Sequence, residues 1–279
     1  MKRIKRFVSI IAIFSLCFSI VPTVHASNTH EYHIVNLEDG TSQDIVIPES
    51  TDDGASFSPS AISTRSIIGD TDDRIPISGD ALNYYPTSAV GVIYAEYTDG
   101  TSGRGTGWLF GPNDVATAAH VLYNKDGYIT DYVEFSIGGS TYVGTNLAVP
   151  GEFMNGRNVN YDYACFELSS NVGNTRGYFG WTQNFSVGDS ITVIGRPGDY
   201  SLNIFAIAFG TVLSSTTSYL ISHNADTLGG MSGSPVFKGN GTGGDAYAIG
   251  IHRGGGDSYN TATRITSTIA GLFAYYRAN

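Results

Sequence analysis

Short runs rich in β-branched and aromatic residues recur along most of the chain, with turn-forming dipeptides between them. The clearest runs lie at residues 88–97, 132–137, 189–194, 204–214 and 246–252. Each run is short enough for one strand, and dipeptides such as Asp99-Gly100 and Pro197-Gly198 mark the turns that separate them. Many short strands at this spacing predict an all-β fold, either a barrel or a sandwich.

The C-terminal end departs from this pattern. Apolar residues recur there at helical spacing, at Ile265, Ile269, Leu272, Phe273 and Tyr276. The spacing predicts one amphipathic helix over about 264–277, which packs its apolar face on the β body.

The first 26 residues have the pattern of a secretory signal peptide. A basic start is followed by an apolar run over 7–21, and Val24 and Ala26 are the small residues that a signal peptidase reads. The run is shorter than the roughly 20 residues that span a bilayer. We therefore expect cleavage after Ala26 and a secreted, extracellular protein that does not use a membrane.

Residues 27–65 are acidic, lack a dense apolar pattern and end in a Ser/Pro/Thr-rich stretch before Arg65. This composition predicts a pro-segment or a flexible linker, with Arg65-Ser66 as the processing site. The remaining residues, 66–279, are enough for one two-lobed domain or two small domains.

Charge and cysteine content exclude several classes of protein. The net charge of −10 argues against nucleic acid or anionic membranes as partners. Cys17 leaves with the signal peptide, so Cys165 is alone and no intrachain disulfide can form. The apolar neighbours of Cys165 indicate a buried thiol and not a nucleophile.

Ser232 is the serine best placed to act as a nucleophile. It lies in Gly230-Met231-Ser232-Gly233-Ser234, where glycines permit a turn that directs the hydroxyl outward. The same turn can point the amides of Gly230 and Ser232 at one spot, as an oxyanion hole requires. Taken alone, the motif could also be a Gly/Ser-rich surface turn. A serine hydrolase also needs a base, and His120 is a candidate that follows a run of small residues.

Taken together, these motifs resemble the chymotrypsin-fold serine peptidases, and most of all the bacterial glutamyl endopeptidases of the staphylococcal V8 type and their Bacillus relatives. The similar segments are Thr117-Ala118-Ala119-His120, Gly230–Val236, Gly195–Asp199 and Gly250-Ile251-His252, together with Ile68-Gly69. The resemblance covers essentially all of residues 66–279. It implies two antiparallel β-barrels, over about 66–180 and 181–262, with the active site between them.

The resemblance also implies the roles of the site residues. Ser232 is the nucleophile, His120 the base and Asp162 the orienting acid, because Asp162 begins a segment similar to the family's Asp-x-Ala; Asp126 and Asp131 lie beside turn residues. We expect a monomer that hydrolyses protein or peptide substrates through an acyl-enzyme. The mechanism needs no cofactor and no metal, and His-Glu-x-x-His is absent, although a structural calcium ion stays open.

The residues that select the substrate side chain give conflicting indications. Asp226 lies six residues before Ser232, where a trypsin-like enzyme keeps the acid that binds Lys or Arg. Thr227 and His252 lie where glutamyl endopeptidases bind a carboxylate, and both can donate hydrogen bonds to it. We favour cleavage after Glu and, less well, Asp, which requires Asp226 to point elsewhere.

Two further expectations and two alternatives follow from the same resemblance. The α-amine of Ser66, once freed, adds positive charge near the pocket. A Glu-specific enzyme could not cut Arg65-Ser66, so a helper peptidase would be needed. One alternative is a peptidase of this fold that cleaves after Lys or Arg and uses Asp226. The other is a catalytically silent secreted binding protein or toxin. His223 has no assigned role.

Overall fold

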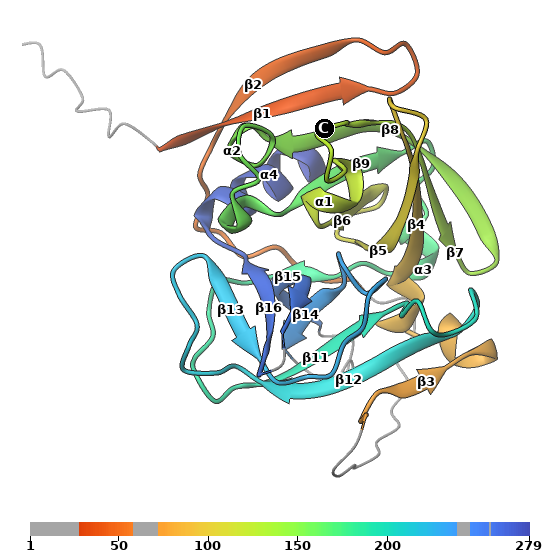
Figure 1. Cartoon of the computed structure of the whole chain (residues 1–279), viewed down its shortest axis with the longest axis vertical. Helices are drawn as coiled ribbons and strands as arrows, with labels where there is room; N and C mark the ends of the chain where they lie inside the picture. Colours follow the sequence, from red (N-terminus) through yellow and green to blue (C-terminus); the bar gives the residue numbers. More distant parts are fainter. Residues whose placement is uncertain (1–27, 58–71, 239–245, 257) are drawn as a thin grey trace, which may run out of the picture.

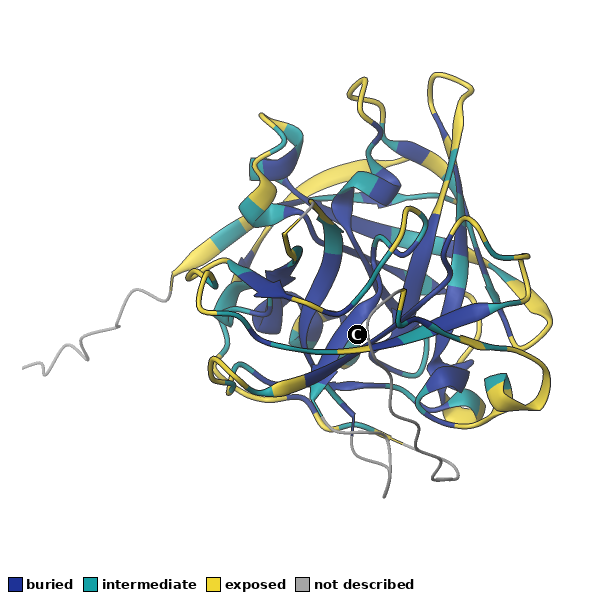
Figure 2. Cartoon of the chain, turned by 60° about the horizontal axis from the view of Figure 1, so that its bottom comes forward, coloured by how far each residue is buried: buried dark blue, intermediate teal, exposed yellow. Residues whose placement is uncertain are grey.

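The computed structural model describes residues 28–57, 72–238, 246–256 and 258–279. Two β-sheets form the body of the molecule (Figure 1). Figure 2 shows that buried residues concentrate in the strands, whereas exposed residues lie mostly in the connecting loops and at the outer edge of the N-terminal strands. The predicted signal peptide (1–26) and the predicted processing site Arg65-Ser66 lie outside the described residues.

The first sheet contains a closed six-stranded barrel, which confirms the predicted all-β class. Its strands are β4 (Val90–Tyr97), β5 (Ser102–Leu109), β6 (Asp114–Thr117), β7 (Thr130–Ile137), β8 (Ser140–Pro150) and β9 (Ala164–Leu168). They are hydrogen-bonded in the order β8-β7-β4-β5-β6-β9, and pairing of β9 with β8 closes the barrel. Phe135 and Phe166 are fully buried, with ring centroids 6.4 Å apart. Trp108 is also fully buried, and its ring packs on Phe179 and Phe273.

The second sheet follows the order β13-β16-β15-β14-β11-β12-β3. Its strands are β3 (Ile75–Ile77), β11 (Ser190–Gly195), β12 (Phe205–Thr211), β13 (Leu220–His223), β14 (Pro235–Lys238), β15 (Tyr247–Gly255) and β16 (Asn260–Arg264), with β10 (Gly180–Trp181) parallel to β15. A bridge between Val212 and His223 joins the β12 side to β13 and brings the sheet round into a second barrel. One strand departs from the predicted ranges, because β3 lies before residue 180 but pairs with β12.

The C-terminal helix α4 (Ser267–Ala278) lies within a few residues of its predicted range. Its apolar face packs on the first barrel, where the Phe273 ring stacks on Phe110 at 4.2 Å between centroids. Gly271 is required inside this helix, because a Cβ there would lie 2.1 Å from the carbonyl oxygen of Pro48. No helix in the described ranges is long and apolar enough to cross a membrane.

Short helical turns connect the strands. They are η1 (Gly79–Asn83), η2 (Thr87–Ala89), α1 (Ala119–Leu122), α2 (Gly151–Met154), η3 (Val159–Tyr161) and α3 (Gly173–Arg176). Cys165 lies in β9, opposite Ala116 and Ala148 on its two neighbouring strands. Its thiol is fully buried, and burial raises its pKa.

The N-terminal segment differs from its prediction. Residues 29–48 form a hairpin of β1 (Thr29–Asn36) and β2 (Ser42–Pro48), and β1 pairs with β8 of the first barrel (Figure 1). The expectation of a flexible linker is therefore wrong for these residues. Few side chains of the hairpin point inward, among them Tyr32 and Ile47, so its apolar pattern is too sparse to indicate a strand pair in the sequence.

Candidate active site

Pairing of β6 with β9 brings His120 beside Asp162. Thr117 at the end of β6 lies opposite Ala164 at the start of β9. His120 follows β6 in the single turn of α1, and Asp162 lies two residues before β9 as the C-cap of η3. His120 Nδ1 lies 2.8 and 3.1 Å from the two carboxylate oxygens of Asp162.

Asp162 is held as a buried carboxylate. Its exposed fraction is 3%, and its Oδ1 also accepts a hydrogen bond of 3.0 Å from the backbone N–H of His120. Arg253 Nε lies 3.5 Å from Oδ2, which makes an ion pair and not a hydrogen bond. Burial alone would raise the pKa of Asp162, but the charge and hydrogen bonds of His120 and the charge of Arg253 lower it.

The turn that carries Ser232 is fixed by backbone contacts to both barrels. Gly230 and Gly233 have φ angles of 99° and 91°, which glycine adopts without steric cost. The amide of Thr106 donates to the carbonyl oxygen of Ser232 at 2.8 Å, and that of Gly233 donates to His252 at 2.7 Å. A Cβ at Gly233 would lie 2.1 Å from the carbonyl oxygen of Thr106, so the two barrels approach closely at this turn.

The amides of this turn fall into two groups. Those of Met231, Gly233 and Ser234 donate to backbone carbonyl oxygens, at 2.7–3.0 Å. Within the described ranges, those of Gly230 and Ser232 have no acceptor in the chain. Two free amides that flank the serine are what a developing oxyanion requires.

The Ser232 hydroxyl donates a long hydrogen bond of 3.4 Å to the carbonyl oxygen of Arg253. In the described part of the chain no hydrogen bond joins it to His120. Arg253 nevertheless links the two halves of the site, because its guanidinium contacts Asp162 while its carbonyl accepts from Ser232. Hydrogen bonds between nucleophile and base are often long in enzymes without substrate.

His252 and His223 form a second pair behind the serine. Their rings lie 5.5 Å apart at 64°, and their exposed fractions are 2% and 0%. Both nitrogens of His223 and Nδ1 of His252 lack hydrogen-bond partners among the described residues. Burial lowers the pKa of His223 to about 4. The pKa of His252 is far below its usual value because of burial and of positive charge on His223, His120 and Arg253.

Asp226 has a contact that bears on specificity. Its Oδ2 accepts a hydrogen bond of 3.0 Å from the backbone N–H of Asp73, so the carboxylate is directed toward the segment that precedes β3. Burial and the charge of Asp226 raise the pKa of Asp73. Thr227 is partly exposed, and Ser66 lies outside the described residues.

Two residues of this region have no role in the sequence prediction. Arg253 follows His252 directly, and the alternation of a strand would have placed it on the opposite face of β15. His223 comes close to His252 only because β13 pairs with β16 and β16 pairs with β15. Its place behind the site therefore depends on tertiary structure.

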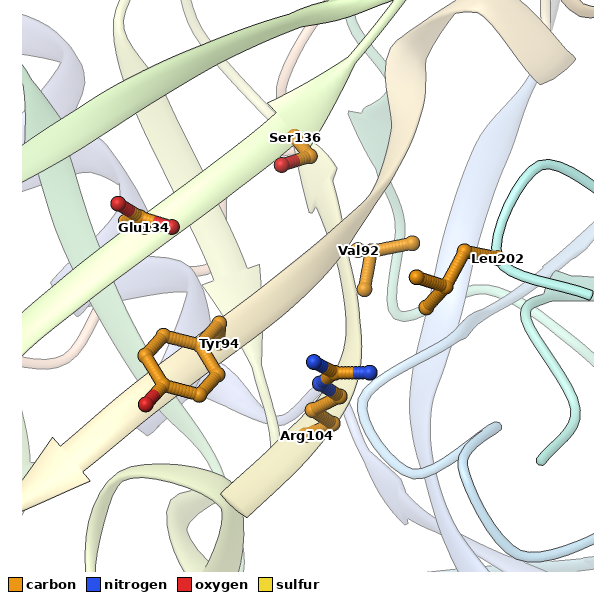
Figure 3. Close-up of a pocket in the computed structure, with 6 residues that line it drawn as sticks. All are labelled: Val92, Tyr94, Arg104, Glu134, Ser136 and Leu202. Carbon is orange, nitrogen blue, oxygen red and sulfur yellow. The ribbon is translucent and has the colours of Figure 1, made fainter. Parts of the chain in front are cut away.

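A separate surface pocket of about 270 Å³ lies on the outer face of the first barrel (Figure 3). Its lining residues are Val92, Tyr94, Arg104, Glu134, Ser136 and Leu202. None of them is a predicted site residue, and Arg104 lies over the Tyr94 ring at 5.7 Å. The described residues bring together no group of three or more His, Cys, Asp or Glu that could hold a metal ion.

Comparisons with known proteins agree with this fold. Residues 105–251 match the trypsin-like peptidase domain. A glutamyl endopeptidase of Bacillus licheniformis is 34% identical over 74% of this chain and 67% of its own length. A Bacillus subtilis protein named extracellular metalloprotease is 35% identical over 76% and 69%. The solved structure of a Glu endopeptidase in complex with MPD covers 77% of this chain and 100% of its own, with a TM-score of 0.62 and 23% identity.

The fold and these similarities define the class, a trypsin-like serine endopeptidase. Within that class the chain belongs to the family of the bacterial glutamyl endopeptidases. The predicted resemblance is therefore confirmed.

Proposed function

We propose that Ser232, His120 and Asp162 are the catalytic triad of this endopeptidase, and that it cleaves peptide bonds after Glu. His120 takes the Ser232 proton as the hydroxyl attacks the scissile carbonyl, and then protonates the leaving amine. Asp162 holds the imidazole in the required tautomer through Nδ1. The amides of Gly230 and Ser232 receive the oxyanion. The observation that carries this proposal is the pair of free amides beside Ser232, linked through Arg253 to the His120–Asp162 pair.

The preference for Glu is supported by three features of the pocket side. His252 is buried and neutral, and its Nδ1 has no partner in the described structure. Thr227 adds a hydroxyl donor. Asp226 accepts from the amide of Asp73, which meets the condition that its carboxylate point elsewhere. This diversion also disfavours the alternative in which Asp226 binds Lys or Arg.

The remaining parts of the proposal concern the secretion, processing and oligomeric state of the protein. It is secreted after loss of residues 1–26 and acts as a monomer on protein or peptide substrates, without nucleic acid or membrane. A helper peptidase cuts Arg65-Ser66 in the pro-segment 27–65, and the freed α-amine of Ser66 adds positive charge near the pocket.

A digest of a peptide library tests the specificity. We expect cuts after Glu, fewer after Asp, and none after Lys or Arg. Cuts after Lys or Arg would overturn the Glu assignment while leaving the triad intact.

Labelling with a fluorophosphonate tests the triad. We expect the label on Ser232, no label on Ser232→Ala, and full labelling in the presence of EDTA. Absence of labelling in correctly processed protein would support the silent binding protein instead. Loss of labelling in EDTA would contradict the expectation that the serine site needs no metal ion.

A further inference from the structure

The surface of the first barrel beside β8 and α4 is covered by residues 28–57, which precede the proposed cleavage site. We propose that this segment stays bound to the peptidase body after cleavage at Arg65-Ser66, as a second, non-covalent chain of the mature enzyme. The inference rests on the processing step of the proposed function. The contacts that carry it lie wholly within described residues.

The first contact is a strand pair. β1 lies antiparallel to β8, with Tyr32 opposite Pro150 and Asn36 opposite Asn146. The amide of Leu37 continues the pairing and donates to the carbonyl oxygen of Thr145 at 2.6 Å. Residues 146–150 of β8 pair with β1 on one edge, and 147–148 of the same stretch pair with β9 on the other, whereas β7 pairs only with 140–143. Departure of β1 would therefore leave an open edge on the barrel sheet.

Buried side chains anchor the hairpin. Tyr32 is fully buried, and its hydroxyl lies 3.1 Å from that of Tyr163, the residue after Asp162. Burial raises the pKa of both tyrosines, so both stay neutral and share one hydrogen bond. Ile47 of β2 is 3% exposed. Loss of the segment would uncover Tyr163 and leave its hydroxyl without this partner.

A polar cluster ties the hairpin to α4. His30 Nε2 lies 3.0 Å from Glu49, and the hydroxyl of Ser267 donates to Glu49 at 2.9 Å. Thr268 contacts both His30 and Glu49, at 3.1 and 3.3 Å. Burial opposes ionisation of Glu49, but these hydrogen bonds lower its pKa. The segment thus carries a carboxylate that is matched to donors on the helix.

A second anchor lies after the hairpin, at the junction of the two barrels. Gly54 exchanges two backbone hydrogen bonds of 3.0 Å with Trp181, and Phe57 exchanges two of 2.8 Å with Tyr178. The indole N–H of Trp181 donates to the carbonyl oxygen of Asp52 at 3.1 Å. Because a Cβ at Gly54 would lie 2.3 Å from the indole ring, the two fit together closely.

The segment leaves the catalytic groups accessible. Its hydrogen bonds to the body run to β8, α2, Tyr163, the segment around β10 and α4, and the His120 side chain is 28% exposed. Cleavage would therefore change how the chain is connected at residue 65 without uncovering the active site. The retained segment acts as a stabilising part of the enzyme and not as a plug that must be expelled.

Mass measurement of the processed, secreted enzyme tests this inference. We expect the mass of two chains under native conditions and two separate chains under denaturing conditions. A fully active enzyme whose native mass is that of residues 66–279 alone would overturn it. A secreted single chain would instead refute the processing step. In that case residues 60–66 are replaced by the recognition sequence of an unrelated peptidase, and this variant is cut in vitro. The same mass measurement then shows whether the N-terminal segment stays bound.

A matched pair of variants separates specific retention from a general effect of mutation. Ile47→Asp places a charge at a position that is 3% exposed, whereas Val46→Asp places it at a neighbour that is 62% exposed. After cutting, we expect Ile47→Asp to lose the segment on gel filtration at least ten times faster than wild type. Val46→Asp should retain it as wild type does. Equal retention in all three proteins would overturn the inference.

Discussion

Two pairs of ionisable groups, His120–Asp162 and His223–His252, lie near Ser232, and they differ in how their polar atoms are satisfied. In the first pair, Asp162 accepts hydrogen bonds from the ring and amide of His120 and lies beside Arg253. In the second, His223 and His252 contact each other through their rings and have three nitrogens without partners in the described structure.

This difference shows that a buried group stays charged where hydrogen-bond donors surround it and becomes neutral where it has no partner. Asp162 keeps its negative charge because donors replace the water it lost. The two histidines are kept neutral because no group in the described structure replaces the water that a positively charged imidazole would need. A buried, neutral imidazole interacts favourably with a bound anion, because the negative charge of the anion stabilises the protonated form of the ring. The first pair is suited to catalysis and the second to binding a carboxylate.

Breaking the first pair gives the largest expected effect. Asp162→Asn keeps the size of the side chain but removes the charge that fixes the His120 tautomer, so we expect kcat to fall about 10⁴-fold. Steady-state hydrolysis of a Glu peptide measures it. Asp126→Asn, in an exposed turn, is the control and should keep wild-type activity. A fall of less than tenfold in Asp162→Asn would refute the role given to Asp162.

Breaking the second pair is expected to affect substrate choice. His252→Leu removes the donor for the substrate carboxylate, and kcat/KM for a Glu peptide should fall about 10²–10³-fold. The rate of labelling by a fluorophosphonate, which needs no carboxylate, should change little. An equal loss in both assays would mean that His252 serves the structure of the site and not the binding of Glu.

The pH dependence of stability sharpens the comparison. Because the pKa of His223 is about 4 in the folded chain and about 6.5 when exposed, only the unfolded chain takes up this proton between these values. The contribution of His223 to stability is therefore complete above pH 6.5 and is lost as the pH falls toward 4. The loss amounts to about 3 kcal/mol at most.

The measurement compares wild type with His223→Leu by urea unfolding from pH 7 to pH 4. Asp114 acts in the opposite direction over this range, because burial and Glu167 raise its pKa to about 7. Both proteins carry Asp114, so its effect cancels in the difference. We expect His223→Leu to gain stability relative to wild type as the pH falls, and a difference that does not vary with pH would contradict a neutral, buried His223.

The smallest effect is expected at Asp226. Asp226→Asn removes a negative charge near the pocket, so kcat/KM for Glu should rise less than about tenfold. Cleavage after Lys or Arg should stay absent in both proteins. A wild type that cleaves after Lys or Arg, and loses this activity in Asp226→Asn, would reverse the assignment of the pocket.

The sequence is enough to predict the strands of the barrels and the C-terminal helix, because their alternation and spacing are local. The motifs around His120 and Ser232 identify the class for a similar reason, since the chemistry needs small residues and glycines next to those side chains. The contact of Asp162 with His120 follows from the pairing of β6 and β9, which the sequence indicates only through the resemblance.

What the sequence does not predict depends on contacts between distant segments. The hairpin of β1 and β2 contributes few inward residues, and it is stabilised by β8 and α4. The low pKa of His223 arises because its ring is buried and its nitrogens have no hydrogen-bond partner in the described structure. No local sequence pattern indicates such an environment. The direction of the Asp226 carboxylate depends on the amide of Asp73, 153 residues away.

The buried Cys165 has a practical consequence for handling the enzyme. From residue 28 onward it is the sole cysteine, and its protonated thiol lies out of reach of solvent between two alanines. The stability of the folded domain therefore does not depend on a disulfide or on the redox state of its surroundings. It can be produced without an oxidative folding system and used together with strong reductants, under which disulfide-dependent protein substrates unfold and expose their peptide bonds to cleavage.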